Sequence, residues 1–214
     1  TEVFTYTGES GHGVEWSVSS GSNSSLYIES SHVTGGVIIN ANPGAYLDFS
    51  YTNTSVIGGI DKAGSGALHM SNHDSGSLID LDIKDGQVIF SNPLSLSNNE
   101  SIELLGTSSA LILSNGLNLA GTINGIEGSR IEIYSDMTIS GTLFGNNNIL
   151  LGASTNLINL QSGYSLSSAI FNGSNSYAIL SLEDAGIYSS SALGMGASFQ
   201  DFEEVNLSDS DDTY

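Results

Sequence analysis

The chain has no cysteine, only three basic residues and only two prolines among its 214 residues. A secreted domain of this size can fold without disulfides, so the lack of cysteine does not identify the compartment. The 23 acidic residues give a formal net charge of −20, which repels phosphate backbones, and we expect no nucleic-acid partner. No apolar run approaches the roughly 18 residues of a membrane helix, so we expect no direct membrane insertion of this segment.

The first residue is Thr and no signal peptide opens the chain. We therefore interpret the sequence as an excised or processed piece of a longer protein. Apolar residues make up 39% of the chain, which excludes a disordered composition, and the 26 glycines favour many tight turns.

An internal repeat organises the sequence. Residues 111–123 and 131–143 superimpose with a shift of 20, so that Leu111 falls on Ile131 and Gly121-Thr122 falls on Gly141-Thr142. Apolar residues alternate with other residues within each copy, which is the two-residue period of a strand. Short strands that recur at a fixed interval are typical of a solenoid.

The same apolar-x-apolar doublet recurs from Phe4 through most of the chain at intervals of 20 to 23 residues. The predicted fold is therefore all-β, a single-stranded right-handed parallel β-helix with coils of about 20–23 residues. We expect residues 1–200 to form the β-helix, and residues 201–214 to form a last strand and an acidic tail that leads into a downstream module. The predicted core column contains Leu26, Leu47, Leu68, Val88, Leu111, Ile131 and Leu151.

Three asparagines follow the doublets at equivalent places, Asn72, Asn92 and Asn115. Asparagine is favoured where the backbone turns, and its amide can hydrogen-bond from one coil to the next. We interpret these residues as structural.

The outward residues of the doublets form a second column, which we predict to be a binding surface. Its members are Tyr27, Asp48, His69, Ile89, Ile112 and Glu132. The two central isoleucines would form an exposed apolar stripe that pairs with another rod, or the longer insertion between Val88 and Leu111 would cover them. We favour the covered arrangement.

Residues for catalysis or zinc binding are few. A site for polysaccharide cleavage can be drawn around Lys62 and Lys84 with nearby aspartates, but solvated turns with local ion pairs explain these residues better. His69 and His73 are four apart, which brings two ligands to one face only on a helix. There is also no Gly-x-Ser-x-Gly elbow with a partner histidine, so we predict no catalytic residues.

Residues 62–72, Lys-Ala-Gly-Ser-Gly-Ala-Leu-His-Met-Ser-Asn, resemble the repeat of autotransporter passenger domains. The similarity continues in residues 83–88, which look like that family's closing turn, in which a glycine leads into the next strand. After Asp74 the family's Gly-Gly-Thr-Thr run is replaced by Gly76-Ser77-Leu78. The resemblance implies a secreted or cell-surface bacterial protein, commonly an adhesin.

The C-terminal residues 202–207, followed by Asp211-Asp212-Thr213, resemble the entry to calcium-binding β-roll repeats of large secreted bacterial proteins, although the nonapeptide array itself is missing. Calcium takes carboxylates and carbonyls from turns. The candidate ligands are Asp209, Asp211 and Asp212, and a charged, solubilising chain end is the alternative reading. We expect no other cofactor.

We predict a non-enzymatic segment of a secreted or surface-exposed bacterial adhesin. It would be a rigid acidic rod that binds a glycan or protein on a host or neighbouring cell, or associates with itself. The alternative is a carbohydrate-active β-helix enzyme, a polysaccharide lyase or hydrolase, which three or more convergent charged side chains on successive coils would favour. A third reading is a structural module of a phage fibre or surface layer.

Overall fold

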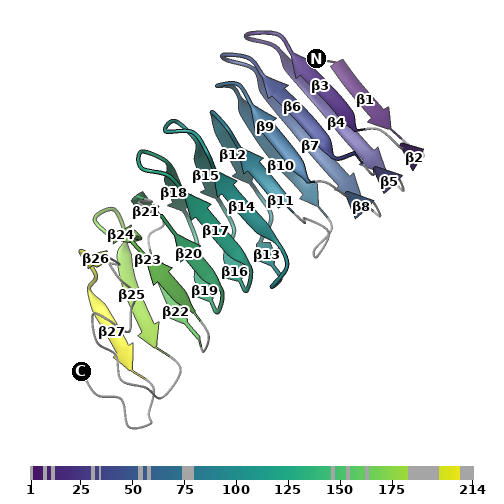
Figure 1. Cartoon of the computed structure of the whole chain (residues 1–214). Coiled ribbons are helices and arrows are strands. Elements are labelled where there is room, and N and C mark those ends of the chain that lie inside the picture. The colour runs from purple at the N-terminus through teal and green to yellow at the C-terminus, as the bar shows by residue number, and fades with distance from the viewer. Residues whose placement is uncertain are drawn as a thin grey trace.

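The computed structural model describes residues 2–6, 9–10, 13–29, 32–33, 35–52, 55–56, 59–73, 80–145, 148–152, 155–161, 164–182 and 198–207. At residues 2–6, 9–10, 29, 32, 52, 55–56, 72–73 and 207 it describes the backbone alone. All regular secondary structure in this described part is β-strand. The strands stack into an elongated body with β1 at one end and β27 at the other (Figure 1).

The strands form four parallel sheets. The largest has ten strands in the order β1 (Glu2–Tyr6), β4 (Asn23–Glu29), β7 (Tyr46–Thr52), β10 (Ala67–His73), β12 (Gln87–Phe90), β15 (Ala110–Leu113), β18 (Arg130–Ile133), β21 (Asn148–Leu151), β24 (Ile170–Asn172) and β26 (Ser198–Gln200). A second has eight strands in the order β3 (Val14–Val18), β6 (Val37–Ala41), β9 (Ile60–Ala63), β11 (Asp80–Ile83), β14 (Ser101–Leu104), β17 (Thr122–Gly125), β20 (Thr142–Phe144) and β23 (Ser165–Ser167).

The two smaller sheets divide the remaining strands between the two ends of the molecule. Six strands are β13 (Leu94–Leu96), β16 (Leu117–Leu119), β19 (Met137–Ile139), β22 (Thr155–Leu160), β25 (Tyr177–Leu182) and β27 (Glu204–Leu207). Three are β2 (Glu9–Ser10), β5 (His32–Val33) and β8 (Ser55–Val56). Where the described strands cover a whole turn, the chain passes from the ten-stranded sheet to one of these and then to the eight-stranded sheet, so the fold is the predicted β-solenoid.

The interior consists of apolar columns that run along the stack. Leu47, Leu68, Val88, Leu111 and Ile131 lie opposite one another on successive strands of the ten-stranded sheet, as predicted, and each is at most 1% exposed. Neighbouring coils cover one another at the roughly 4.8 Å spacing of paired strands. Each buried aliphatic side chain contributes about 2 kcal/mol to the free energy of unfolding. Because the neighbouring coils bury these side chains, a single coil is not stable without them.

Two members of the predicted column are out of register. Leu26 lies opposite Phe49 instead of Leu47, and Leu151 lies opposite Ile133 instead of Ile131. Both remain buried, because a shift of two residues keeps a side chain on the same face of a strand. The shift makes the coil after Ile131 only 18 residues long (149 − 131), shorter than the predicted range.

Asparagine side chains link consecutive coils, as the sequence predicts. Asn92 Nδ2 donates to the carbonyl of Ser71 at 2.9 Å, and Asn115 Nδ2 donates to the carbonyl of Ser91. The bonds run from amide to backbone instead of from amide to amide. The side chain of Asn72 lies outside the described part.

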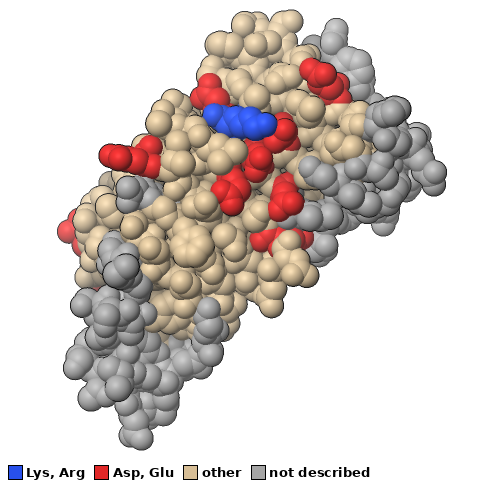
Figure 2. Space-filling view, in the orientation of Figure 1, with Lys and Arg blue, Asp and Glu red and all other residues tan. Residues whose placement is uncertain are grey.

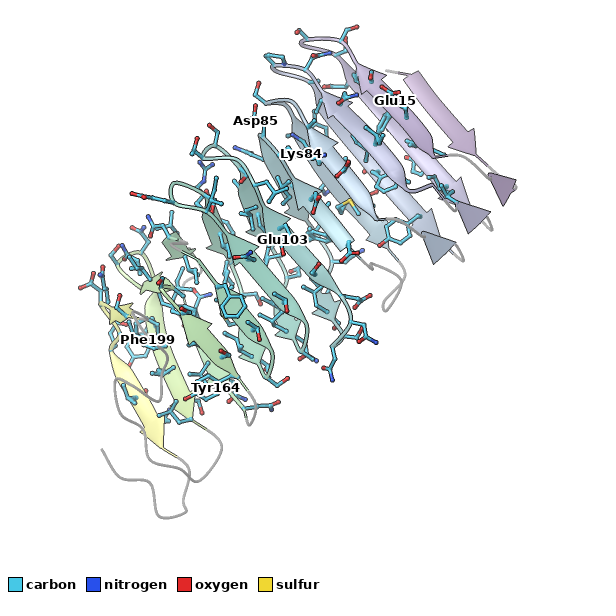
Figure 3. All side chains as sticks on the ribbon, viewed as in Figure 1. Glu15, Lys84, Asp85, Glu103, Tyr164 and Phe199 are labelled. Atoms are coloured by element: carbon cyan, nitrogen blue, oxygen red, sulfur yellow. The ribbon has the colours of Figure 1, made fainter. Side chains whose placement is uncertain are left out.

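Aromatic side chains close the core toward its C-terminal end. The rings of Phe171 and Phe199 stack with centroids 4.8 Å apart, and Phe202 meets Phe199 edge-on at 5.4 Å. Figure 3 labels Phe199 at this end of the molecule. Trp16 is 7% exposed and belongs to the core at the other end.

Candidate functional site

Five of the six predicted binding residues lie in one column on the outer face of the ten-stranded sheet. Asp48, His69, Ile89, Ile112 and Glu132 occupy paired positions on five consecutive strands, and we call this column the stripe. Tyr27 is not part of it. Its partner on β7 is Ser50, and Ser25 lies opposite Asp48, because β4 is shifted by two residues relative to the predicted register.

A polar group lies at the N-terminal end of the stripe. Asp48 Oδ1 lies 3.3 Å from His69 Nδ1, and His69 Nε2 lies within hydrogen-bonding distance of Ser91 Oγ. The ring of Tyr46 tilts against the imidazole with centroids 5.7 Å apart. Burial, and to a smaller extent the charge of Asp48, raises the pKa of the Tyr46 phenol.

The sequence did not single out Ser91 or Tyr46 as partners of His69. Ser91 comes two residues after Ile89, so the two-residue period places both on the outer face. The contact with His69 is diagonal between coils, and only the register of β10 against β12 reveals it.

A second polar group lies at the other end of the stripe. Arg130 Nε donates to Glu132 Oε1 at 2.7 Å, and Tyr134 Oη donates to Glu132 Oε2 at 2.9 Å. The hydrogen bond to Glu132 raises the pKa of the Tyr134 phenol, with burial as a smaller cause. The carboxylate of Glu132 is therefore held by groups of its own coil.

The middle of the stripe is apolar and partly exposed. Ile89 and Ile112 are half-buried, and the insertion between Val88 and Leu111 does not cover them. That insertion instead forms β13 and β14, which pair within other sheets of the solenoid. The predicted cover is wrong, because the additional residues are used to lengthen the coil.

The outer face of the eight-stranded sheet carries a different column. Asp61, Asp82 and Glu103 lie opposite one another on β9, β11 and β14, and we call them the ladder. Lys84 Nζ lies 2.8 Å from Asp61 Oδ2, and Asn124 Nδ2 donates to Glu103 at 2.9 Å. Figure 2 shows one basic side chain among several acidic ones on this side, and Figure 3 labels Lys84 and Glu103 there.

The position of Asp82 in the middle of the ladder shifts its titration. Burial and the charge of Asp61 raise the pKa of Asp82, while Lys84 opposes the shift. The hydrogen bond to Asp61 raises the pKa of Lys84. Two adjacent carboxyl groups, one of them with a raised pKa, are an arrangement used in acid–base chemistry.

Lys62 does not join Lys84 on this face, and its predicted solvated position is wrong. Its side chain is fully buried in the apolar column between Ile39 and Ile83. The ammonium group donates to the carbonyls of Gly64, Gly66 (2.7 Å) and Asp85 (2.6 Å). Burial lowers the pKa of Lys62 to about 8, and the charge of Asp85 partly opposes this shift.

The described residues include no group of three or more His, Asp or Glu side chains that could hold a metal ion. The predicted calcium ligands Asp209, Asp211 and Asp212 lie outside the described residues, as does the side chain of His73. The backbone of β27, just before the acidic tail, pairs with β25 and continues the solenoid.

Within the described ranges, no helix has the length and apolar character needed to cross a membrane. Comparisons with protein-family models, with curated proteins and with solved structures found no match to this chain.

Proposed function

We propose that this chain is a rigid segment of a secreted or surface-exposed bacterial adhesin, and that it binds its partner or a second copy of itself through the stripe. The observation that carries the proposal is the in-register column of five outward residues with partly exposed isoleucines at its centre. Flat apolar patches bordered by polar groups are characteristic of interaction surfaces.

The shape and charge of the rod support the same role. Stacked coils hold the stripe on a face that cannot bend without breaking coil-to-coil hydrogen bonds. The net charge of −20 favours neutral or cationic partners, and the repulsion between rods opposes non-specific aggregation. The similarity of residues 62–72 to autotransporter repeats supports secretion to the cell surface.

The test is binding of the purified chain to a glycan array and to cultured cells, together with sedimentation to detect self-association. The double variant Ile89→Thr/Ile112→Thr keeps β-branched residues in the strands but weakens the apolar surface. We expect at least a tenfold loss of binding or association. Ile126→Thr changes an isoleucine that is 41% exposed in a turn and should leave both unchanged.

Loss of binding in the Ile126→Thr variant with retention in the double variant would place the interaction elsewhere on the rod. Absence of any partner and of self-association would refute the adhesin role. Repeating the measurements with calcium and with a chelator tests whether Asp209, Asp211 and Asp212 contribute a calcium site.

A carbohydrate-active enzyme is the second candidate, and the ladder favours it. Asp61, Asp82 and Glu103 place three carboxylates on successive coils, next to a lysine. Asp82, with its raised pKa, would be the general acid, and its paired neighbour Asp61 would be the second carboxyl group of the site. Release of reducing or unsaturated ends from a polysaccharide panel, abolished by Asp82→Asn, would support this function, and no release would exclude it.

A further inference from the structure

A relay of three side chains crosses three consecutive coils at the N-terminal end of the stripe. Asp48 is on β7, His69 on β10, and Ser91 directly follows β12. The carboxylate contacts Nδ1 of the imidazole, with Oδ1 3.3 Å away, and Nε2 of the same ring contacts the hydroxyl of Ser91. One ring therefore bridges an acid and an alcohol through its two nitrogens.

The fold holds this relay in place. Asp48 and His69 are paired residues of adjacent strands, so their side chains leave the sheet side by side. The ring of Tyr46 lies against the imidazole and limits its rotation. Both side chains are partly accessible, with 28% of Asp48 and 22% of His69 exposed, so a small molecule can reach the ring.

We propose that Ser91 is an activated nucleophile with His69 as its base and Asp48 as the residue that orients the imidazole. Asp48 Oδ1 lies 3.3 Å from Nδ1 without a hydrogen bond, and a carboxylate at this distance favours the tautomer that carries its proton on Nδ1 and leaves the lone pair of Nε2 for the Ser91 hydroxyl. This is the division of roles that serine nucleophiles require, and it is recognised by geometry independently of fold or sequence order.

The reaction is transfer of an acyl group from an ester. Ser91 Oγ forms a bond to the ester carbonyl carbon while its proton passes to His69 Nε2. The carbon–oxygen bond of the ester then breaks, and the departing alcohol takes that proton. Water, deprotonated by His69, attacks the acylated serine and releases the carboxylic acid, which returns the hydroxyl to Ser91.

The surroundings define the substrate class as neutral esters with a short apolar acyl chain. Ile89, two residues before Ser91 on the same face, and Ile112 on the next coil offer half-buried apolar surface for that chain. The carboxylates of Asp48 and Glu132 at the two ends of the stripe repel anionic esters.

The donor that we assign to the developing oxyanion is the hydroxyl of Ser114. Ser114 lies beside Ser91 on the following coil, since its N–H donates to the carbonyl of Phe90 at 3.0 Å. Because a rotating hydroxyl stabilises an oxyanion less than fixed backbone amides do, we expect slow turnover, best seen with activated esters.

The first test uses the absence of cysteine from the chain. Ser91→Cys introduces a single thiol next to His69, which should favour the thiolate. Its alkylation by iodoacetamide at neutral pH should be at least tenfold faster than that of Ser95→Cys, which is exposed on β13 in another sheet. Adding His69→Gln should remove the advantage. Equal rates for the two single variants would overturn the proposal.

The second test uses the natural serine. An alkyl fluorophosphonate should label the wild-type chain at Ser91, as located by peptide mass spectrometry, and p-nitrophenyl butyrate should be hydrolysed. Ser91→Ala and His69→Gln should each lower labelling at least tenfold. Ser95→Ala should not. Labelling that persists in folded Ser91→Ala would overturn the proposal.

The positioning role of Asp48 has its own readout. Asp48→Asn should slow labelling of Ser91, and the conservative Asp48→Glu should restore most of it. If Asp48 had only a structural role, Asp48→Asn and Asp48→Glu would change thermal stability equally, and Asp48→Glu would not restore the labelling of Ser91. The binding function proposed above is independent, because Ser91→Ala should leave adhesion through Ile89 and Ile112 intact.

Discussion

The stripe and the ladder are built by the same backbone register but have opposite electrostatic character. On both faces, paired residues of successive coils lie about 4.8 Å apart. The ladder repeats one charge, so Asp61 repels Asp82, and Lys84 compensates both carboxylates. The stripe combines an acid, an imidazole and isoleucines, and His69 and Glu132 each contact polar groups next to them.

This difference shows how a solenoid encodes a surface. Stacking multiplies the effect of any side chain that recurs, so a repeated carboxylate produces strain and a shifted pKa, whereas a varied column produces a defined site. The packing of the core does not depend on which residues face outward, because only the inward residues of each strand contribute to it.

The two faces meet at the corner between β11 and β12, where Gly86 lies. Its φ is +71°, and a Cβ atom there would lie 2.5 Å from Lys62 Nζ and 2.6 Å from the carbonyl oxygen of Gly66. Gly86→Ala should therefore have the largest effect, lowering the free energy of unfolding by about 3 kcal/mol from strain and crowding together. Chemical denaturation measures this change.

Gly21→Ala is the matched control for this substitution. Gly21 also has a positive φ, +69°, but no atom lies within 4 Å of the added carbon. Its cost should be about 1 kcal/mol, from backbone strain alone. If both substitutions lowered the free energy of unfolding equally, Lys62 and the carbonyls of the corner would have to move aside for the added carbon at Gly86. The two faces would then not be rigidly joined at this corner.

Lys62→Met should have the next largest effect. The apolar side chain fits the column between Ile39 and Ile83, but the carbonyls of Gly64, Gly66 and Asp85 lose their donor. We expect a loss of about 2 kcal/mol at neutral pH, because unpaired buried acceptors are costly. Lys84→Met, one coil later and on the exposed face, should cost under about 1 kcal/mol. If Lys62→Met were as stable as the wild type or more stable, the burial of the charge would destabilise the fold by more than its hydrogen bonds stabilise it.

The same lysine predicts a pH dependence. Its pKa of about 8 in the folded chain lies below the ordinary value of 10.5, so the unfolded chain binds more protons between these values. The free energy of unfolding contributed by Lys62 therefore rises with pH across this range. The difference between wild type and Lys62→Met, measured from pH 7 to 10.5, should show this slope and cancel the titration of other groups.

The architecture could be predicted from the sequence because apolar alternation and a fixed interval are both local patterns. The register could be predicted only to within two residues. Displacing Leu26 or Leu151 by two positions leaves the hydrophobic pattern unchanged, and the true coil length is set by turns whose length the pattern does not specify. The wrong placement of Tyr27 has this single cause.

The sites were less predictable because they depend on contacts between coils. The stripe followed from outward positions, but the diagonal contact of Ser91 with His69 needs the register of a particular pair of strands. Lys62 was placed in solvent because a lysine is rarely buried. Lys62 comes two residues after buried Ile60, so the two-residue period of the strand indicates that its side chain points inward. The prediction gave more weight to the charge of the residue than to this period.

The smallest predicted effect tests the ladder itself. Asp82→Asn removes the central charge, so the repulsion from Asp61 disappears and the free energy of unfolding at pH 7 should rise by about 0.5 kcal/mol. The folded chain holds the Asp82 proton to higher pH than the unfolded chain does, because its pKa is raised. The contribution of Asp82 to stability therefore falls as pH rises through the folded pKa, and the gain should vanish in acid.

Glu127→Gln is the control for this prediction, since Glu127 is an exposed carboxylate in a turn away from the ladder. It should change the free energy of unfolding by less than Asp82→Asn does. If both variants gain equally, the effect reports the overall net charge of the chain. If only Asp82→Asn gains and the gain is lost in acid, the stacking of like charges on adjacent coils is its source, which is the property that separates the ladder from the stripe.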